Sequence, residues 1–352
     1  MPLPSAEHHH MVFLQGDVLQ IPQFDLPAPL TYSQTVYNWT TAAQVPERIR
    51  DASIIALSAV RIDAHALSPE VSPHLKLIVM VATGYDCVDL EACRKRGVVV
   101  SNCPNSNIEA VSEHAIGMYF AARRKLLNMH MATRAGKWRQ KGLLMLDYVD
   151  KDGTPPLTCQ DEIAGIIGNG SVGEEQYLAF LVLLNLTVRL GKRIAMLASS
   201  LGMKVIVSDR KSSTTTDSSR VPFESVIKQS TVLFVAVPLL DSTRNFISTA
   251  EFESMSPHAV LVNVSRGGTV DEEALVKALR EGKISGAATD VFKEEPAGPE
   301  NSPLVAEDAK DLNIIATPHL AWLSQRTAVN YATKLKLAID GWSRGQPVNV
   351  VA

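Results

Sequence analysis

The sequence has little of several features that mark well-known classes of protein. Its four cysteines in 352 residues show no CxxC spacing, so we expect reduced thiols in a cytoplasmic protein and no metal site. Lys and Arg number 34 against 37 Asp and Glu, and a net charge of −3 argues against a nucleic-acid partner. Residues 1–11 hold no apolar signal core, and the longest apolar stretch falls short of the ~20 residues of a membrane span. The three histidines at 8–10 are interpreted as a solvated N-terminal run.

The composition is otherwise that of a globular protein long enough for two domains, with 46% hydrophobic and 20% charged residues. Apolar strands alternate with helical stretches in two series, which predicts parallel sheets covered by helices. The first series has strands at 11–14, 53–57, 75–81 and 98–101. The second has strands at 163–167, 204–208, 231–237, 260–264, 286–291 and 313–316. Between the series we expect a hinge near 102–105, a long helix over 108–131 and a polar connection over 137–156.

A glycine-rich turn follows the apolar run 163–167 and is typical of a strand that turns beneath a dinucleotide pyrophosphate. In this Gly-x-Gly-x-x-Gly pattern, Gly168 makes the tight turn, Gly170 lets the phosphates approach, and Gly173 lets the next helix pack on its strand. The intervening residues predicted to contact the cofactor are Asn169, Ser171 and Val172. The pattern is specific only when a helix follows and an acidic residue comes about 20 positions later.

The spacing after this turn is wrong for a dinucleotide fold. Asp209 ends the next strand and is the expected ribose-binding acid, but it lies 36 positions after Gly173 instead of about 20. Without residues 174–191 the spacing is 18. Residues 192–202 already read as the amphipathic first helix, so 174–191 is interpreted as an insertion that separates the turn from its helix.

Three explanations of the insertion compete: a family-specific helix, a membrane span, and a retained intron. The first conflicts with the apolar character of the segment and with its position, and the second conflicts with its length. We favour the retained intron, because the segment is in frame and bounded by Gly173 and Gly191, as splicing within a glycine codon would leave it. Gly173–Glu174 can encode a GTGAG donor, Leu186–Thr187 a CTGAC branch point, and Leu190–Gly191 a TAG acceptor.

Three later strands are each followed by a residue suited to catalysis. Arg266 follows the strand at 260–264, Glu295 follows 286–291, and His319 follows 313–316. In open α/β sheets, ligands bind outside the carboxyl ends of the strands. Singly, each has a plain structural explanation, but their joint occurrence in this order after a nucleotide-binding turn predicts an active site.

The order of these motifs and their residues resemble those of the D-isomer-specific 2-hydroxyacid dehydrogenase family, and within it the glycerate dehydrogenase/hydroxypyruvate reductase branch. The resemblance covers nearly the whole chain outside 174–191 and includes residues 82–90 and 110–114, Val237–Pro238, and Trp322 after His319. It implies a Rossmann-type doubly wound NAD-binding domain over 104–316. It also implies a smaller flavodoxin-like substrate-binding domain over 1–103 and 317–352.

The resemblance also implies roles for individual residues. Arg266 would hold the substrate carboxylate and keto oxygen, and His319 would act as general acid and base, with Glu295 favouring its protonated form. Backbone N–H groups near Thr83 and Gly84 would bind the substrate carboxylate. Asp290 would lie near the nicotinamide carboxamide, Val237 and Pro238 would line the cofactor, and the long helix would form a homodimer.

The expected cofactor is NAD, because the Asp209 carboxylate accepts from ribose hydroxyls and repels a 2′-phosphate. Arg210 and Lys211 follow and are able to accept that phosphate, so NADP stays open. The favoured function is hydride transfer between the cofactor and hydroxypyruvate, glyoxylate or D-glycerate. Residues 58–60 lack the larger polar or basic side chain expected in the substrate loop, and whether Arg61 substitutes for it stays open. The alternatives are an NADH-sensing binding protein like the corepressors that share this fold, and an inactive product of the retained intron.

Overall fold

The computed structural model describes residues 5, 7–150, 153–168, 190–211 and 220–352. Its contacts divide the chain into two compact units, which we call unit 1 (Met1–Asn107 with Leu323–Ala352) and unit 2 (Ile108–Trp322). By contacts the units part after 107 and 322, where the sequence predicted 103 and 316. The assignment of substrate and cofactor binding to the two parts stays a prediction.

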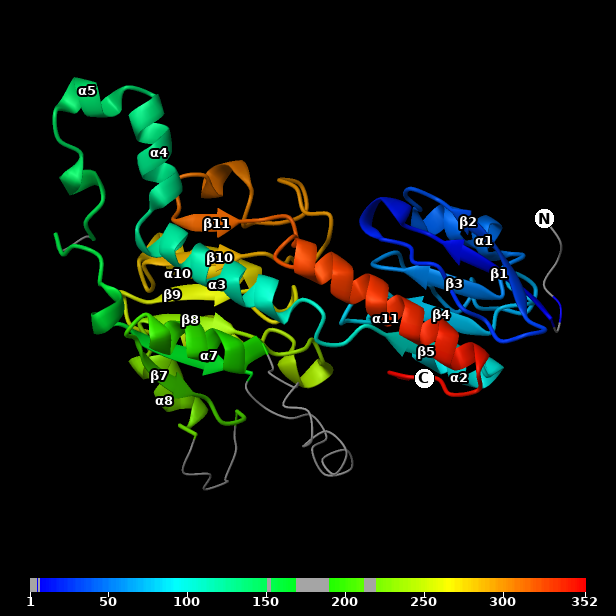
Figure 1. Cartoon of the computed structure of the whole chain (residues 1–352). Coiled ribbons are helices and arrows are strands. Elements are labelled where there is room, and N and C mark those ends of the chain that lie inside the picture. The colour runs from blue at the N-terminus through cyan, green and yellow to red at the C-terminus, as the bar shows by residue number, and fades with distance from the viewer. Residues whose placement is uncertain (1–4, 6, 151–152, 169–189, 212–219) are drawn as a thin grey trace. The chain divides into compact units, whose positions relative to one another are not determined.

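Unit 1 is built on a five-stranded sheet, all parallel, with the order β2-β1-β3-β4-β5. The strands are β1 (His8–Phe13), β2 (Thr31–Val36), β3 (Ile54–Leu57), β4 (Leu77–Met80) and β5 (Val99–Asn102). Its helices are α1 (Val45–Ile49), α2 (Leu90–Arg96) and α11 (Gln325–Ser343), seen with the sheet in Figure 1. This 2-1-3-4-5 order is the flavodoxin-like arrangement that the sequence predicted. Sequence reasoning missed β2, a mostly polar edge strand whose side chains are not buried.

The histidine run is part of the buried strand β1, so its interpretation as a solvated stretch is wrong. His9 and His10 are only 4% and 7% exposed. His8 bonds the hydroxyls of Thr31 and Ser33 on β2, at 2.9 and 3.0 Å. Burial lowers the pKa of His9 and of His10 below the usual value. In the part of the chain that the structure describes, no group of three or more potential ligands could hold a metal ion.

Unit 2 is built on a six-stranded parallel sheet with the order β11-β10-β9-β8-β6-β7. Its strands are β6 (Ile163–Ile167), β7 (Lys204–Val207), β8 (Val232–Val235), β9 (Val260–Asn263), β10 (Gly286–Thr289) and β11 (Ile314–Ala316). A single parallel bridge from Val221 to Ser208 adds the beginning of a further strand beside β7. With that bridge, the order is the doubly wound Rossmann arrangement, whose switch point lies between β6 and β8.

Helices cover both faces of this sheet. Helices α3 (Ile108–Arg123) and α7 (Leu190–Ser200) pack on one face. Helices α8 (Phe223–Gln229), α9 (Thr249–Ser254) and α10 (Glu272–Glu281) pack on the other (Figure 1). Along β8, Val232 and Phe234 face the first layer whereas Leu233 and Val235 face the second. The two-residue period of the strand therefore builds two cores, which explains why the strands read as continuous apolar runs.

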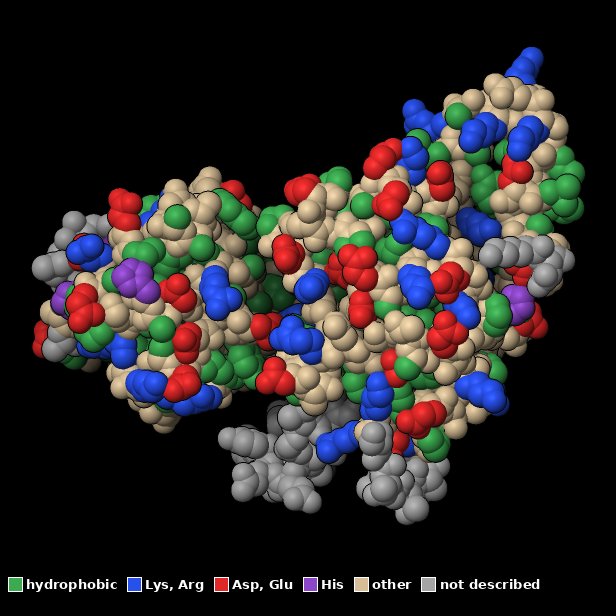
Figure 2. Space-filling view, turned by 180° about the vertical axis from the view of Figure 1, so that it is seen from behind, with side chains coloured by type: hydrophobic (Ala, Val, Ile, Leu, Met, Phe, Trp, Pro, Cys, Tyr) green, Lys and Arg blue, Asp and Glu red, His purple; other side chains and the backbone are tan. Residues whose placement is uncertain are grey.

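The long helix predicted over 108–131 is broken. It ends as α3 at Arg123, and Lys125 takes a left-handed conformation with φ 48° before α4 (Leu126–Arg134) and α5 (Lys137–Lys141). The segment 124–146 projects from unit 2 and appears at the upper right of Figure 2, where hydrophobic and basic side chains gather. The exposed large apolar residues of this segment are Leu126, Leu127, Met131, Trp138, Leu143, Met145 and Leu146. We call this segment the arm. The sequence predicted a polar connection over 137–156, but the part of it that belongs to the arm exposes Trp138, Leu143, Met145 and Leu146. None of the helices in the described residues is long and apolar enough to cross a membrane.

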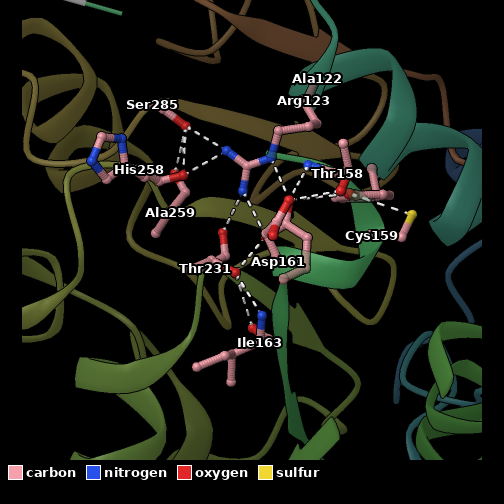
Figure 3. A network of polar contacts seen from close by, with 12 residues as sticks. Ala122, Arg123, Thr158, Cys159, Asp161, Ile163, Thr231, His258, Ala259 and Ser285 are labelled. Atoms are coloured by element: carbon pink, nitrogen blue, oxygen red, sulfur yellow. Dashed lines mark hydrogen bonds and ion pairs between the residues drawn. The ribbon is translucent and has the colours of Figure 1, made fainter. Parts of the chain in front are cut away.

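A buried ion pair ties α3 to the amino ends of the strands in unit 2 (Figure 3). The Arg123 guanidinium donates to both carboxylate oxygens of Glu162, at 2.6 and 3.0 Å. It also donates to the carbonyls of Thr231 and His258, at 2.8 and 2.6 Å. Glu162, Thr231 and His258 come just before β6, β8 and β9. The network therefore aligns these strands at the edge opposite to their carboxyl ends.

Candidate active site

The carboxyl ends of five strands in unit 2 lie level at one edge of the sheet. The register pairs Ile167 with Val235, Val235 with Asn263, Asn263 with Thr289, and Thr289 with Ala316. Because these are the last residues of β6, β8, β9, β10 and β11, the segments that follow them meet at this edge. All of the predicted catalytic and cofactor residues of unit 2 follow one of these strands or β7.

His319 and Glu295 form a direct pair. The Nδ1 atom of His319 lies 2.7 Å from a carboxylate oxygen of Glu295, and both side chains are about one-third exposed, at 39% and 35%. The other oxygen of Glu295 accepts from the N–H of Phe292 at 2.9 Å. Burial raises the pKa of Glu295, but the hydrogen bond and charge of His319, together with the Phe292 N–H and the charge of Arg266, outweigh it and leave the pKa lowered. The Glu295 carboxylate thus orients the imidazole through Nδ1, which leaves Nε2 as the other ring nitrogen.

Asp290 is the residue that holds the histidine segment in place. Its carboxylate is 1% exposed and accepts from the N–H groups of Leu320 and Ala321, at 2.9 and 2.8 Å, and from the Thr317 hydroxyl at 2.6 Å. These bonds fix the backbone around His319, which has the left-handed φ of 55°. Sequence reasoning assigned Asp290 to the nicotinamide and missed this positioning role, since the bonds join segments 30 residues apart.

Arg266 stands on a turn that is packed against the segment carrying Glu295. The Arg266 carbonyl accepts from the side chains of Asn263 and Thr269, at 3.2 and 2.7 Å. A Cβ atom on the next residue, Gly267, would lie 1.7 Å from the carbonyl oxygen of Phe292, so only glycine permits this approach. Arg266 contributes to the lowered pKa of Glu295 through its charge. The structure therefore brings Arg266, Glu295 and His319 together at one edge.

The glycine turn after β6 has the features of a phosphate-binding turn where the structure describes it. Gly168 has φ 103°, and a Cβ there would lie 2.3 Å from the Ala236 carbonyl oxygen. The predicted contacts at Asn169, Gly170, Ser171, Val172 and Gly173 lie outside the described residues. Helix α7 begins at Leu190, and a Cβ on Gly191 would lie 2.7 Å from the carbonyl oxygen of Gly168. Gly191 thus makes the close helix–strand approach that the third glycine of such a turn provides.

The remaining cofactor candidates flank that turn. Asp209 follows β7, and one of its carboxylate oxygens accepts from the N–H of Arg210 at 2.8 Å. Val237 and Pro238 follow β8. The residue before them, Ala236, donates its N–H to the carbonyl of Ile167 at the end of β6, at 2.8 Å. These residues surround the switch point between β6 and β8, which is where a dinucleotide binds in this fold. The positive φ of Gly168, the close packing of Gly191 of α7 against it, and an acid after the second strand fit the pyrophosphate and ribose of such a cofactor.

The predicted substrate loop lies in unit 1, at the carboxyl end of β4. Asn102 donates to the Thr83 carbonyl at 2.8 Å, and the Thr83 hydroxyl bonds the Asn107 side chain at 3.1 Å. The N–H of Cys103 donates to Ala82 at 3.0 Å. These bonds hold the segment with Thr83 and Gly84 against the end of β5. Asn102 is 6% exposed and was not singled out from the sequence.

Gln15 holds the neighbouring loop after β3 and was also missed. Its side-chain oxygen accepts from three successive backbone N–H groups, those of Ser58, Ala59 and Val60, at 2.9, 2.8 and 3.2 Å. Gln15 is 1% exposed. Three convergent N–H groups form a concavity suited to anions, and here a neutral amide of the chain fills it. The loop after β3 is therefore ordered by a residue 43 positions away.

A doubly wound sheet with Gly168 in a tight turn after its first strand, an acid after its second strand and Arg266, Glu295 and His319 at one edge is typical of a dinucleotide-dependent α/β oxidoreductase. The sequence profile described as D-isomer specific 2-hydroxyacid dehydrogenase, NAD binding domain, matches residues 187–321, starting close to where α7 begins. The glycerate dehydrogenase of Methylorubrum extorquens is 33% identical over 342 residues, covering 97% of this chain and 98% of that protein. The glyoxylate reductase of Thermococcus litoralis is 30% identical over 316 residues, covering 87% and 85%.

Among solved structures, the NADPH-dependent glyoxylate/hydroxypyruvate reductase of Sinorhizobium meliloti, in complex with NADP and malonate, has a TM-score of 0.73 at 26% identity. It covers 98% of this chain and 97% of its own. The chain belongs to the D-isomer-specific 2-hydroxyacid dehydrogenase family. It is an oxidoreductase of the CH–OH group that uses a nicotinamide dinucleotide, and its two-unit α/β fold is the one predicted.

Proposed function

We propose that the protein reduces hydroxypyruvate or glyoxylate with NADH, or oxidises D-glycerate in the reverse direction. The observation that carries the proposal is the 2.7 Å pair of His319 and Glu295, at the same sheet edge as Arg266. The names of the relatives from Methylorubrum extorquens and Thermococcus litoralis support this class of small substrate.

Each residue has a role that its chemistry supports. The forked Arg266 guanidinium suits the carboxylate and keto oxygen of a 2-keto acid. His319 gives a proton to the keto oxygen during reduction and takes it back during oxidation, and the Glu295 carboxylate stabilises the charged imidazole. When bound, the nicotinamide supplies the hydride. The N–H groups near Thr83 and Gly84 receive the substrate carboxylate. Asp290 keeps His319 aimed by holding the backbone beside it.

NADH consumption with hydroxypyruvate and with glyoxylate tests the proposal. We expect His319→Ala and Arg266→Ala to lower kcat/KM by at least about 100-fold, the size of a general acid–base contribution. The matched controls are His258→Ala and Arg280→Ala, whose side chains pair with Asp150 and Asp308 away from this edge. Equal rates in the His319 variant and its control would overturn the assignment. Tight NADH binding without turnover of any 2-keto acid would favour the NADH-sensing alternative.

We also propose that the protein is a homodimer. The exposed apolar side chains of the arm support this, because a monomer seldom exposes so many within one segment. Trp138 and Met145 line a hollow of the arm that a second copy would cover. Light scattering after size exclusion should give twice the chain mass, and Trp138→Glu should shift it to the monomer; a monomeric parent chain would refute this.

A cytoplasmic location is proposed from the four free thiols and is tested by fractionation.

A further inference from the structure

Lys211, one of the two cations that follow the ribose-binding acid, is held by its own chain. Its ammonium group donates to the Glu251 carboxylate at 2.8 Å and to the Phe246 carbonyl at 3.3 Å. It also lies 5.3 and 5.2 Å from the ring centres of Phe223 and Phe246, which pack edge to face. Carboxylate, carbonyl and two aromatic faces all stabilise the same cation.

Glu251 is fixed in a position to hold that cation. It is 8% exposed, and its second carboxylate oxygen accepts from the N–H of Ser248 at 3.0 Å, closing the capping box of α9. A carboxylate anchored to a helix start does not follow a lysine that swings away. Moving Lys211 to another anion would leave Glu251 largely buried and unpaired, which is costly.

We infer that Glu251 is a specificity-determining residue for the cofactor: it withdraws Lys211 from the ribose end of the dinucleotide, and so disfavours a 2′-phosphate. Recognition of a 2′-phosphate needs a cation near the acid that ends the second strand, and Lys211 lies two positions after Asp209. With its ammonium group paired to Glu251, Lys211 offers less positive charge to a 2′-phosphate beside Asp209. Glu251 touches no part of the cofactor in this scheme and acts only by positioning Lys211. The inference rests on the proposed function, in which Asp209 binds the ribose.

Dissociation constants measured by calorimetry test the inference, with NADH and NADPH as ligands. AMP and adenosine 2′,5′-bisphosphate serve as probes of the adenosine half alone. The variants are Glu251→Gln, which keeps the cap to Ser248 but loses the charge, and the double variant Glu251→Gln/Lys211→Met. Arg210 is exposed and unchanged in every variant, so its charge is a constant background. Each protein is prepared both as the full chain and without residues 174–191.

In the parent protein we expect NADH to bind at least about tenfold more tightly than NADPH, a difference of ~1.4 kcal/mol. Glu251→Gln should lower the dissociation constants of NADPH and the bisphosphate by about tenfold, because Lys211 loses its charge-assisted hydrogen bond to Glu251 and becomes available to the phosphate. The dissociation constants of NADH and AMP should change by less than about twofold. The double variant should return to the parent values. If Glu251 has a merely structural role, Glu251→Gln should weaken the binding of all four ligands alike, and that result would refute the inference.

Two further results would also overturn it. One is equal affinity of the parent for NADH and NADPH. The other is tighter NADPH binding in Glu251→Gln that persists in the double variant Glu251→Gln/Lys211→Met. These outcomes are distinct from failure of the proposed function, in which NADH binds but no 2-keto acid is reduced. If neither dinucleotide binds either form of the chain, the proposed function and this inference fail together.

Discussion

Gly191 is the residue at which the packing of the phosphate turn can be tested most directly. A Cβ on Gly191 would lie 2.7 Å from the Gly168 carbonyl oxygen and 3.3 Å from the Ile166 side chain. The obstacle is backbone in the turn itself, so relief requires α7 to move off β6. We expect Gly191→Ala to cost about 1–3 kcal/mol of unfolding free energy, the usual cost of overpacking. Because this turn is the predicted pyrophosphate site, NADH affinity should fall as well.

The chain offers a matched control for this substitution in α3. Gly117 has no other atom within 4 Å of an added Cβ, so Gly117→Ala should stabilise the helix by about 0.5–1 kcal/mol. Urea unfolding followed by circular dichroism gives the free energies, and hydrogen exchange of β6 and α7 peptides locates the effect. Gly173→Ala, in the same chain, should cost less than Gly191→Ala. The opposite order would show that Gly173 is the third glycine of the turn and that our assignment of Gly191 is wrong.

Three further changes have defined outcomes. Deleting residues 174–191 leaves one glycine between Val172 and Lys192, and we expect higher solubility and tighter NADH binding; loss of binding, or transcripts that retain the segment, would exclude the retained intron. The lowered pKa of Glu295 means that its stabilisation is complete above its unfolded pKa and is lost as pH falls through the folded value. The stability gap between the parent and Glu295→Gln should therefore shrink in urea titrations taken from pH 7 into the acid range, and a gap that widens on acidification contradicts this. Arg123→Met leaves a buried carboxylate unpaired and should cost about 3–5 kcal/mol in the same assay, against less than about 1 for the exposed Arg280→Met; equal costs would contradict the buried role.

Gly191 also bears on the origin of the preceding segment. The sequence left open whether Gly173 or Gly191 belongs to the turn, because both bound the 18-residue interval. Gly191 makes the helix–strand contact, and the family profile begins at residue 187, near the end of that interval. Both observations support a chain in which α7 once followed the turn directly. The retained intron stays a prediction that transcript sequencing tests.

Local patterns were enough for much of the fold. Buried parallel strands are continuous apolar runs, so β4, β8 and β9 were recognised without knowledge of their partners. The end of α2 at the left-handed Gly97 and the start of α10 at Asp271 follow from capping chemistry that acts within one turn. The break after α3 was missed, because no glycine or proline marks it and Lys125 adopts a left-handed φ instead.

By itself the sequence was enough to predict Arg266, Glu295 and His319 as the catalytic residues, since each follows a recognisable strand and the strand ends of a parallel sheet share one edge. Only the tertiary structure decided how those residues are held. Asp290 bonds the histidine segment, Gln15 bonds the loop after β3, and Glu251 pairs with Lys211. Each of these contacts joins residues 30 to 44 positions apart. A side chain in isolation does not reveal which distant N–H or ammonium group the packed fold will bring to it, and burial then makes that one partner obligatory.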